Sequence, residues 1–169
     1  DKFLLEQISI AGQATFDPNN PSHGTSMAET ILRALQEITK GNTSVQILPV
    51  DVYGPNATSS TFDIGKGIYE AVKGGANVLN LSLGGPGDDG LLQTIINQAT
   101  ALGIPIFAAA GNQPTTAAFY PAAYSGVTAV TAVDNGRIAP YANRGDFVSL
   151  GFPGTGVVHR TLSRGAAGR

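Results

Sequence analysis

Hydrophobic positions along the chain follow two spacings, and their alternation predicts strands separated by helices. Runs that are apolar at nearly every position predict strands over 7–11, 45–52, 78–83, 104–110, 127–133 and 147–152. Apolar residues three or four positions apart predict helices over 27–38, 62–72 and 91–102. The chain therefore has the order of a protein in which helices connect successive strands of one sheet.

The predicted helices are bounded by capping and stop residues. Ser26 and Glu29 have the spacing of a capping box at the start of the first helix. The second helix is expected to open near Ser60 or Thr61. Glycines end all three helices, at Gly41, at Gly74 and Gly75, and at Gly103.

Strands that are apolar almost throughout indicate a sheet covered on both sides. We predict an α/β fold with three layers, a doubly wound and mostly parallel sheet with helices on both faces. Ligand sites in such sheets gather at the carboxyl ends of the strands. We expect a single domain over 1–169, with an irregular tail over 155–169.

Composition and charge exclude several classes of protein. The chain is 42% hydrophobic and 13% charged, which is typical of a compact globular domain. A net charge of −2 without a basic block argues against nucleic acid and anionic membranes as partners. No apolar run reaches the roughly 20 residues that span a bilayer. The first residues do not form a signal peptide, and the absence of cysteine excludes disulfides and thiol chemistry.

His23 is the first candidate for chemistry. It follows a loop rich in turn residues and lies in the first turn of the predicted first helix. A histidine there can act as a general base, because its usual pKa is near 6.5 and the helix dipole favours the neutral ring. The alternative is a histidine that only fills the loop.

Two strand ends carry the other candidates. Small residues at the end of the 104–110 strand would leave room for a ligand backbone, and Asn112 could donate a hydrogen bond to an oxyanion. The 78–83 strand continues into a segment that could pair with an extended peptide. Asn80, within that strand, is expected to be buried with hydrogen-bond partners. Ordinary turns are the alternative for both ends. The residues concerned are Ser82, Leu83 and Gly84 in one segment and Ala109, Ala110, Gly111 and Asn112 in the other.

Together these segments resemble the subtilisin-like (subtilase) family of serine proteases. His23-Gly24-Thr25 is similar to the family's histidine motif, the 75–84 segment to its substrate-binding strand, and the 109–112 segment to its oxyanion motif. The resemblance implies peptide hydrolysis through an acyl-enzyme, with His23 as general base and Asn112 as oxyanion donor. It implies that Ser82, Leu83, Gly84 and Gly154 contact substrate and that Ala109, Ala110 and Gly111 line the specificity pocket. No cofactor is required for this chemistry.

The sequence departs from the family pattern at two motifs. It has no Asp-Thr-Gly or Asp-Ser-Gly before His23, and Ser163 does not lie in the nucleophile motif that should follow Gly154. The segment 24–28 matches that motif in letters, but the later strands follow in the order expected after the histidine. Phe152 also stands where the family often has a small residue. We therefore expect a core that lacks both ends and needs the remainder of its catalytic domain.

Further expectations follow from the resemblance and from the expected truncation. By resemblance the protein is extracellular or belongs to the cell envelope, and its substrate is a polypeptide. Sheet edges left exposed by missing strands would promote self-association. A structural calcium ion is a possible addition, with Asp88 and Asp89 as ligands. His159 is expected to be a surface residue.

Two other classes of function remain open. One is a non-catalytic relative that binds peptides by strand addition. The other is a nucleotide-binding domain, because 85–90 matches G-x-G-x-x-G between a strand and a helix. Two acidic residues in that loop would repel a pyrophosphate, so a surface turn explains these glycines better.

Overall fold

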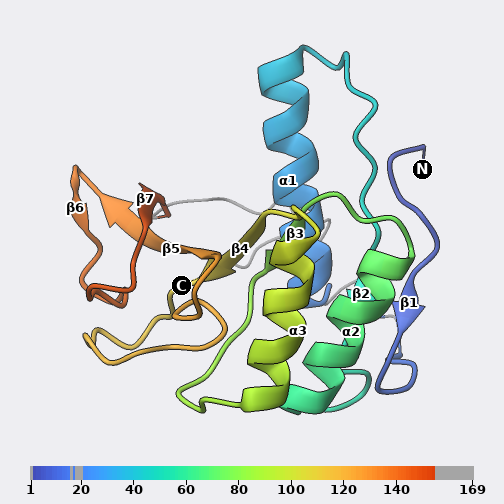
Figure 1. The fold of residues 1–169 in the computed structure, drawn as a ribbon. Helices are drawn as coiled ribbons and strands as arrows, with labels where there is room; N and C mark the ends of the chain where they lie inside the picture. The colour runs from blue at the N-terminus through green and yellow to red at the C-terminus, as the bar shows by residue number, and fades with distance from the viewer. Residues whose placement is uncertain (1, 16, 18–20, 155–169) are drawn as a thin grey trace. The chain divides into compact units, whose positions relative to one another are not determined.

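The computed structural model describes residues 2–15, 17 and 21–154. These residues form two compact units, one within 1–59 and the other within 60–154 (Figure 1). The expected irregular tail over 155–169, with His159 and Ser163, lies outside the described residues. The single-domain expectation stays a prediction, and each unit is described by itself.

The first unit contains one long helix, α1 (His23–Thr39). Ser22 caps it, because the Ser22 hydroxyl accepts a hydrogen bond from the Thr25 N–H at 3.2 Å. The predicted capping box of Ser26 and Glu29 is wrong, since the helix begins before Ser26. Glu29 instead forms an i,i+4 ion pair with Arg33 at 3.1 Å.

Two short parallel strands complete the first unit, β1 (Ile8–Ser9) and β2 (Val50–Asp51). Both are shorter than the predicted strands, although a bridge between Leu4 and Ile47 extends the pairing. The Asp51 carboxylate accepts hydrogen bonds from the next turn, from the N–H groups of Tyr53 at 3.0 Å and Gly54 at 2.9 Å. This turn ends the strand immediately after Asp51.

The second unit is built on a mostly parallel sheet. Strands β3 (Leu79–Leu81), β4 (Ile106–Ala109) and β5 (Val127–Asp134) lie in that order, and β7 (Leu150–Pro153) pairs with β5. All of these pairs are parallel, which confirms the predicted α/β fold. A short antiparallel strand that was not predicted, β6 (Arg137–Ile138), folds back on β5. Asn135 and Gly136 join them with positive φ angles of 47° and 76°.

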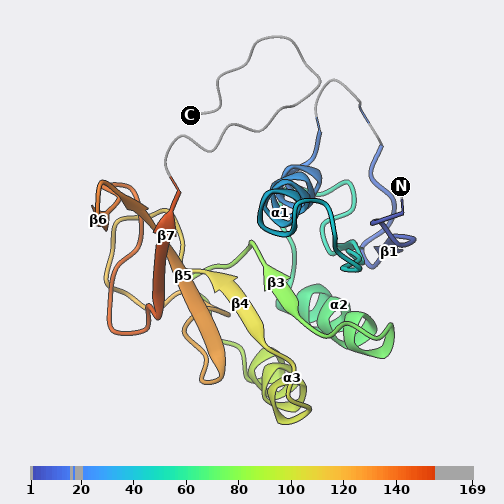
Figure 2. The same cartoon turned by 90° about the horizontal axis from the view of Figure 1, so that it is seen from above.

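The two helices of this unit, α2 (Thr61–Lys73) and α3 (Gly90–Ala101), lie along the same face of the sheet (Figure 2). Leu92 and Ile96 on α3 and Ile106 and Ala129 on the strands are almost fully buried. Asn80 is exposed, and its amide donates a hydrogen bond to the Ser82 hydroxyl at 2.9 Å. The expectation of a buried Asn80 is therefore wrong, because its face of β3 is not covered by α2 or α3.

Asp89 fixes the start of α3. Its carboxylate accepts hydrogen bonds from the N–H groups of Leu91 and Leu92 and from the Thr61 hydroxyl. The hydrogen bond from Leu92, then that from Thr61, holds the pKa of Asp89 below its usual value, even though burial acts in the opposite direction. The buried Tyr124 hydroxyl accepts a hydrogen bond from the Asp89 N–H at 2.8 Å, and burial raises the pKa of that hydroxyl.

Candidate functional site

The end of β3 presents backbone groups that the sheet leaves unused. Parallel pairing with β4 stops after Leu81, which lies opposite Ala108. The chain then pairs again only at Gly85, which exchanges two backbone hydrogen bonds with Tyr120. Between these points, Leu83 and Gly84 form no backbone hydrogen bond with any described residue. This segment can therefore pair with an extended peptide, as the sequence indicated.

The end of β4 is a buried strand followed by a sharp turn. Ala110 is fully buried, and its N–H donates to the Val130 carbonyl of β5 at 2.8 Å. Gly111 then has a φ of 106°, a conformation that side-chain-bearing residues rarely adopt. Asn112 follows in an exposed position, and its side chain has no hydrogen-bond partner among the described residues. Its amide is thus available to a ligand.

The Phe119 ring brings these two strand ends together. A Cβ atom placed on Gly84 would lie 2.5 Å from Cε1 of this ring and 2.7 Å from the Tyr120 carbonyl oxygen. A Cβ atom placed on Gly111 would lie 3.2 Å from Cδ1 of the same ring. Both glycines therefore lie against one aromatic ring. The structure thus places the 82–84 and 109–112 segments close to each other, at the ends of neighbouring strands.

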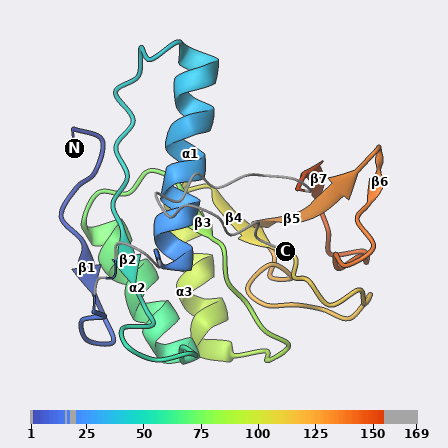
Figure 3. The same ribbon diagram turned by 180° about the vertical axis from the view of Figure 1, so that it is seen from behind.

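The loop after β4 is held by a segment that the sequence analysis did not single out. The Asn143 N–H donates to the Gly111 carbonyl at 3.0 Å, and the Gln113 N–H donates to Asn143 Oδ1 at 2.7 Å. The next residue continues the contact, since the Arg144 N–H donates to the Thr115 carbonyl at 2.9 Å. The loop after β4 and the loop between β6 and β7 accordingly run side by side (Figures 1 and 3).

No sequence signal would have found Asn143. It lies in a polar loop between two strands, where asparagine is ordinary turn chemistry. In the structure it is fully buried, and its backbone carbonyl accepts a further hydrogen bond from the buried Thr131 hydroxyl at 2.6 Å. Only the fold places it beside the candidate oxyanion donor.

His23 belongs to the first unit, whereas the strand-end candidates belong to the second. It is the first residue of α1 and is exposed. This is the predicted position, at the start of a helix after a loop. Its role as general base stays a prediction.

Gly154 is not brought to the other candidates of its unit. It follows β7, and its N–H donates to the Val133 carbonyl of β5 at 3.2 Å. A Cβ atom there would lie 2.7 Å from the Ala132 side chain. Strand β5 therefore lies between Gly154 and the loop after β4. Phe152, on β7, is 58% exposed, so its ring fills no pocket of this unit.

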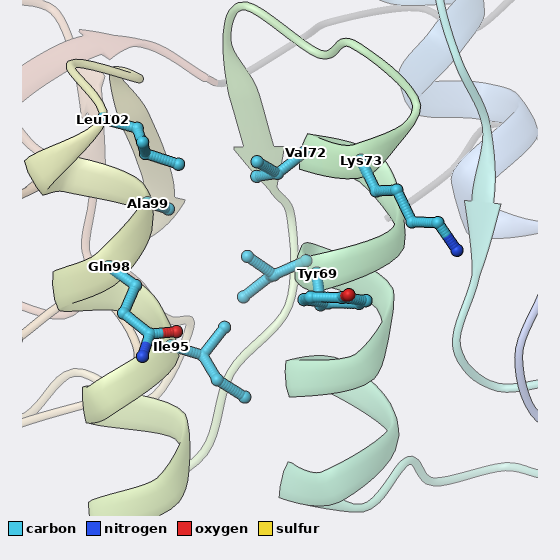
Figure 4. A pocket seen from close by; sticks show the side chains of 8 residues that line it. Tyr69, Val72, Lys73, Ile95, Gln98, Ala99 and Leu102 are labelled. Carbon is cyan, nitrogen blue, oxygen red and sulfur yellow. The ribbon is translucent and has the colours of Figure 1, made fainter.

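An apolar groove of ≈ 200 Å³ lies between α2 and α3, away from these residues. Tyr69, Val72 and Leu102 are among its lining side chains (Figure 4). None of the candidate residues lines it. The candidate site is consequently an open backbone surface at the strand ends rather than this groove.

The polar groups of the loop before α3 form hydrogen bonds within the second unit. Asp89 already accepts the N–H groups of Leu91 and Leu92, which a pyrophosphate would need. In residues 2–15, 17 and 21–154, no group of three or more histidine, aspartate and glutamate residues is arranged to hold a metal ion. The oxygens of Asp88 and Asp89 accept hydrogen bonds from Tyr124, from Thr61 and from the α3 backbone. A calcium ion bound by this pair stays a prediction.

The chain combines a mostly parallel sheet, candidate groups at the strand ends and a histidine at the start of a helix. This combination is typical of one class of protein. The model of the subtilase family matches residues 6–167, so the chain belongs to the subtilase family. It is 34% identical over 159 residues to a thermostable alkaline protease of Halalkalibacterium halodurans, covering 89% of the chain and 44% of that relative. It is 33% identical to subtilisin Savinase of Lederbergia lenta, covering 89% of the chain and 59% of that protein.

Solved structures agree with this assignment. A mutant of the protease domain of PatA superposes with a TM-score of 0.73 at 25% identity, covering 89% of the chain and 59% of that domain. A cold-adapted subtilisin-like serine proteinase superposes with a TM-score of 0.61 at 27% identity, covering 66% of the chain and 42% of that protein. The chain thus spans about half the length of its relatives. None of the helices in its described part is long and apolar enough to cross a membrane.

Proposed function

We propose that this chain carries the substrate-binding and oxyanion-binding part of a serine endopeptidase. The observation that carries the proposal is that two neighbouring strand ends both present hydrogen-bonding groups that the fold itself does not use. The backbone of Leu83 and Gly84 is unpaired, and the exposed Asn112 amide has no partner among the described residues. A peptide added beside Leu83 and Gly84 would run toward the loop that carries Asn112.

The proposed reaction divides its work among three groups. His23 accepts the proton of a serine hydroxyl while that oxygen attacks the peptide carbonyl, and then gives the proton to the leaving amine. The Asn112 side-chain amide donates a hydrogen bond to the carbonyl oxygen as it becomes an oxyanion. Water then hydrolyses the acyl-enzyme. We propose that this serine, and the aspartate that orients His23, lie outside these 169 residues.

The test is labelling with a fluorophosphonate, read by intact-mass spectrometry. The full-length polypeptide should take up one adduct, on a serine outside this chain, whereas the 169-residue chain should take up none. A His23→Ala variant of the full-length polypeptide should lose the labelling, because the serine then lacks its base. An adduct on Ser26 or Ser163 would contradict the assignment of the motifs.

The rival function is peptide binding without hydrolysis. It gains weight from the absence of the family's aspartate and serine motifs in this sequence. Absence of labelling in the full-length polypeptide, together with saturable binding of an extended peptide, would favour it. Secretion to the extracellular space or the cell envelope is also part of the proposal. Recovery of the full-length protein from the cytoplasm alone would exclude that location.

A further inference from the structure

We infer that Asn143 is a positioning residue for Asn112, the proposed oxyanion donor. Asn143 contacts the residues on both sides of Asn112 rather than Asn112 itself. Its N–H donates to the carbonyl of Gly111, and its Oδ1 accepts from the N–H of Gln113. Two hydrogen bonds thus fix the peptide units that flank the donor. The catalytic role of Asn143 rests on the proposed function of Asn112, whereas the two hydrogen bonds of Asn143 do not depend on it.

The anchor itself is buried and bonded to the sheet. Asn143 is fully buried, and its carbonyl oxygen accepts a hydrogen bond from Thr131, a buried residue of β5. Asn143 therefore connects the Asn112 loop to β5, a central strand of the sheet. Without this anchor, the nearest backbone hydrogen bonds on either side of Asn112 would be those of the Ala110 N–H with Val130 and of the Thr115 carbonyl with Arg144.

Asparagine is suited to this position by both ends of its side chain. Oδ1 accepts the hydrogen bond from the Gln113 N–H. Nδ2 lies against Gly111, and a Cβ atom added to Gly111 would lie 2.6 Å from Nδ2. Nδ2 is buried and has no hydrogen-bond partner among the described residues. The hydrogen bond from Gln113 is thus the one that the side chain makes within the described part of the chain, and an apolar side chain of similar shape could not accept it.

The experiment compares amide hydrogen exchange in three variants of the 169-residue chain. Asn143→Leu keeps the branched shape of the side chain but removes the acceptor for Gln113. Asn143→Asp restores an acceptor oxygen at the same place. Tyr124→Phe is the control, because it removes the hydrogen bonds of the Tyr124 hydroxyl at the start of α3 and none of the hydrogen bonds that flank Asn112.

The readout is the exchange rate of the Gln113 amide relative to that of Val130 in β5. We expect Asn143→Leu to raise this ratio about 3- to 10-fold, which corresponds to the loss of one hydrogen bond. The ratio should stay unchanged in Tyr124→Phe and return toward that of the original chain in Asn143→Asp. A ratio in Asn143→Leu equal to that of the control would overturn the inference, because the residue would then act only on overall stability.

A second measurement gives the catalytic consequence in the full-length polypeptide. Asn143→Leu should lower kcat about tenfold or more while KM changes less than twofold, since a displaced oxyanion donor acts on the transition state. A raised KM with unchanged kcat would overturn the inference. If the unmodified polypeptide hydrolyses no peptide, the proposed function fails, and the exchange ratio still decides whether Asn143 positions the loop.

Discussion

Replacement of Gly111 by alanine is the sharpest test of the site geometry. Gly111 has a φ of 106°, and a strained backbone conformation of this kind costs about 1–3 kcal/mol in a residue with a side chain. The added Cβ would also lie 2.6 Å from Asn143 Nδ2 and 3.2 Å from Phe119 Cδ1. Overpacking in a filled interior adds about 1–3 kcal/mol. We therefore expect Gly111→Ala to destabilise the second unit by about 3 kcal/mol or more.

Gly136→Ala provides the matched control. Gly136 also has a positive φ, 76°, but a Cβ atom there meets nothing within 4 Å. Only the backbone cost remains, which is about 1–2 kcal/mol. The difference between the two variants thus isolates the close approach of Gly111 to Asn143 and Phe119.

Urea unfolding followed through NMR signals of β4 and β5 measures both variants in the unit concerned. The free energy of unfolding follows from the midpoint and slope of each curve. Gly111→Ala should lower the midpoint clearly more than Gly136→Ala. Equal losses would refute the reasoning, because the contacts of Gly111 would then contribute nothing beyond backbone strain.

Three further predictions test the helix ends and the sheet edge. Ser22→Ala should destabilise α1 by about 1 kcal/mol, because the helix loses its cap. Ser26→Ala should leave the cap intact. Urea unfolding followed by circular dichroism distinguishes the two variants. The lowered pKa of Asp89 stabilises the folded state above the ordinary value of 3.8, and this contribution should fade as the pH falls through the lowered folded pKa. An Asp89→Ala variant should lose that part of the acid dependence in a pH series of thermal midpoints. Strand β3 is an edge of its sheet, so we expect self-association that grows with concentration in light scattering. A constant monomeric mass would contradict this last expectation.

Local patterns were sufficient for most elements of the fold. The helical spacing of apolar residues identified α1, α2 and α3, and the expected opening of α2 at Ser60 is confirmed. The pattern failed at strand ends, where β1 and β2 are shorter than their apolar runs. It also failed at the cap of α1, because both Ser22 and Ser26 are chemically suitable and only the path of the chain decides between them.

The candidate site divides in the same way. The sequence by itself determined which residues are candidates for the chemistry, because small residues and an asparagine after an apolar strand are local features that persist in any correct fold. Only the tertiary structure decided how the strand ends meet, with Phe119 against two glycines and Asn143 holding the loop around Asn112. The reason is that the contacts of Phe119 with Gly84 and of Asn143 with Gln113 join residues 30 or more positions apart. No periodicity or local motif encodes a pairing that arises only when neighbouring strands align in the sheet.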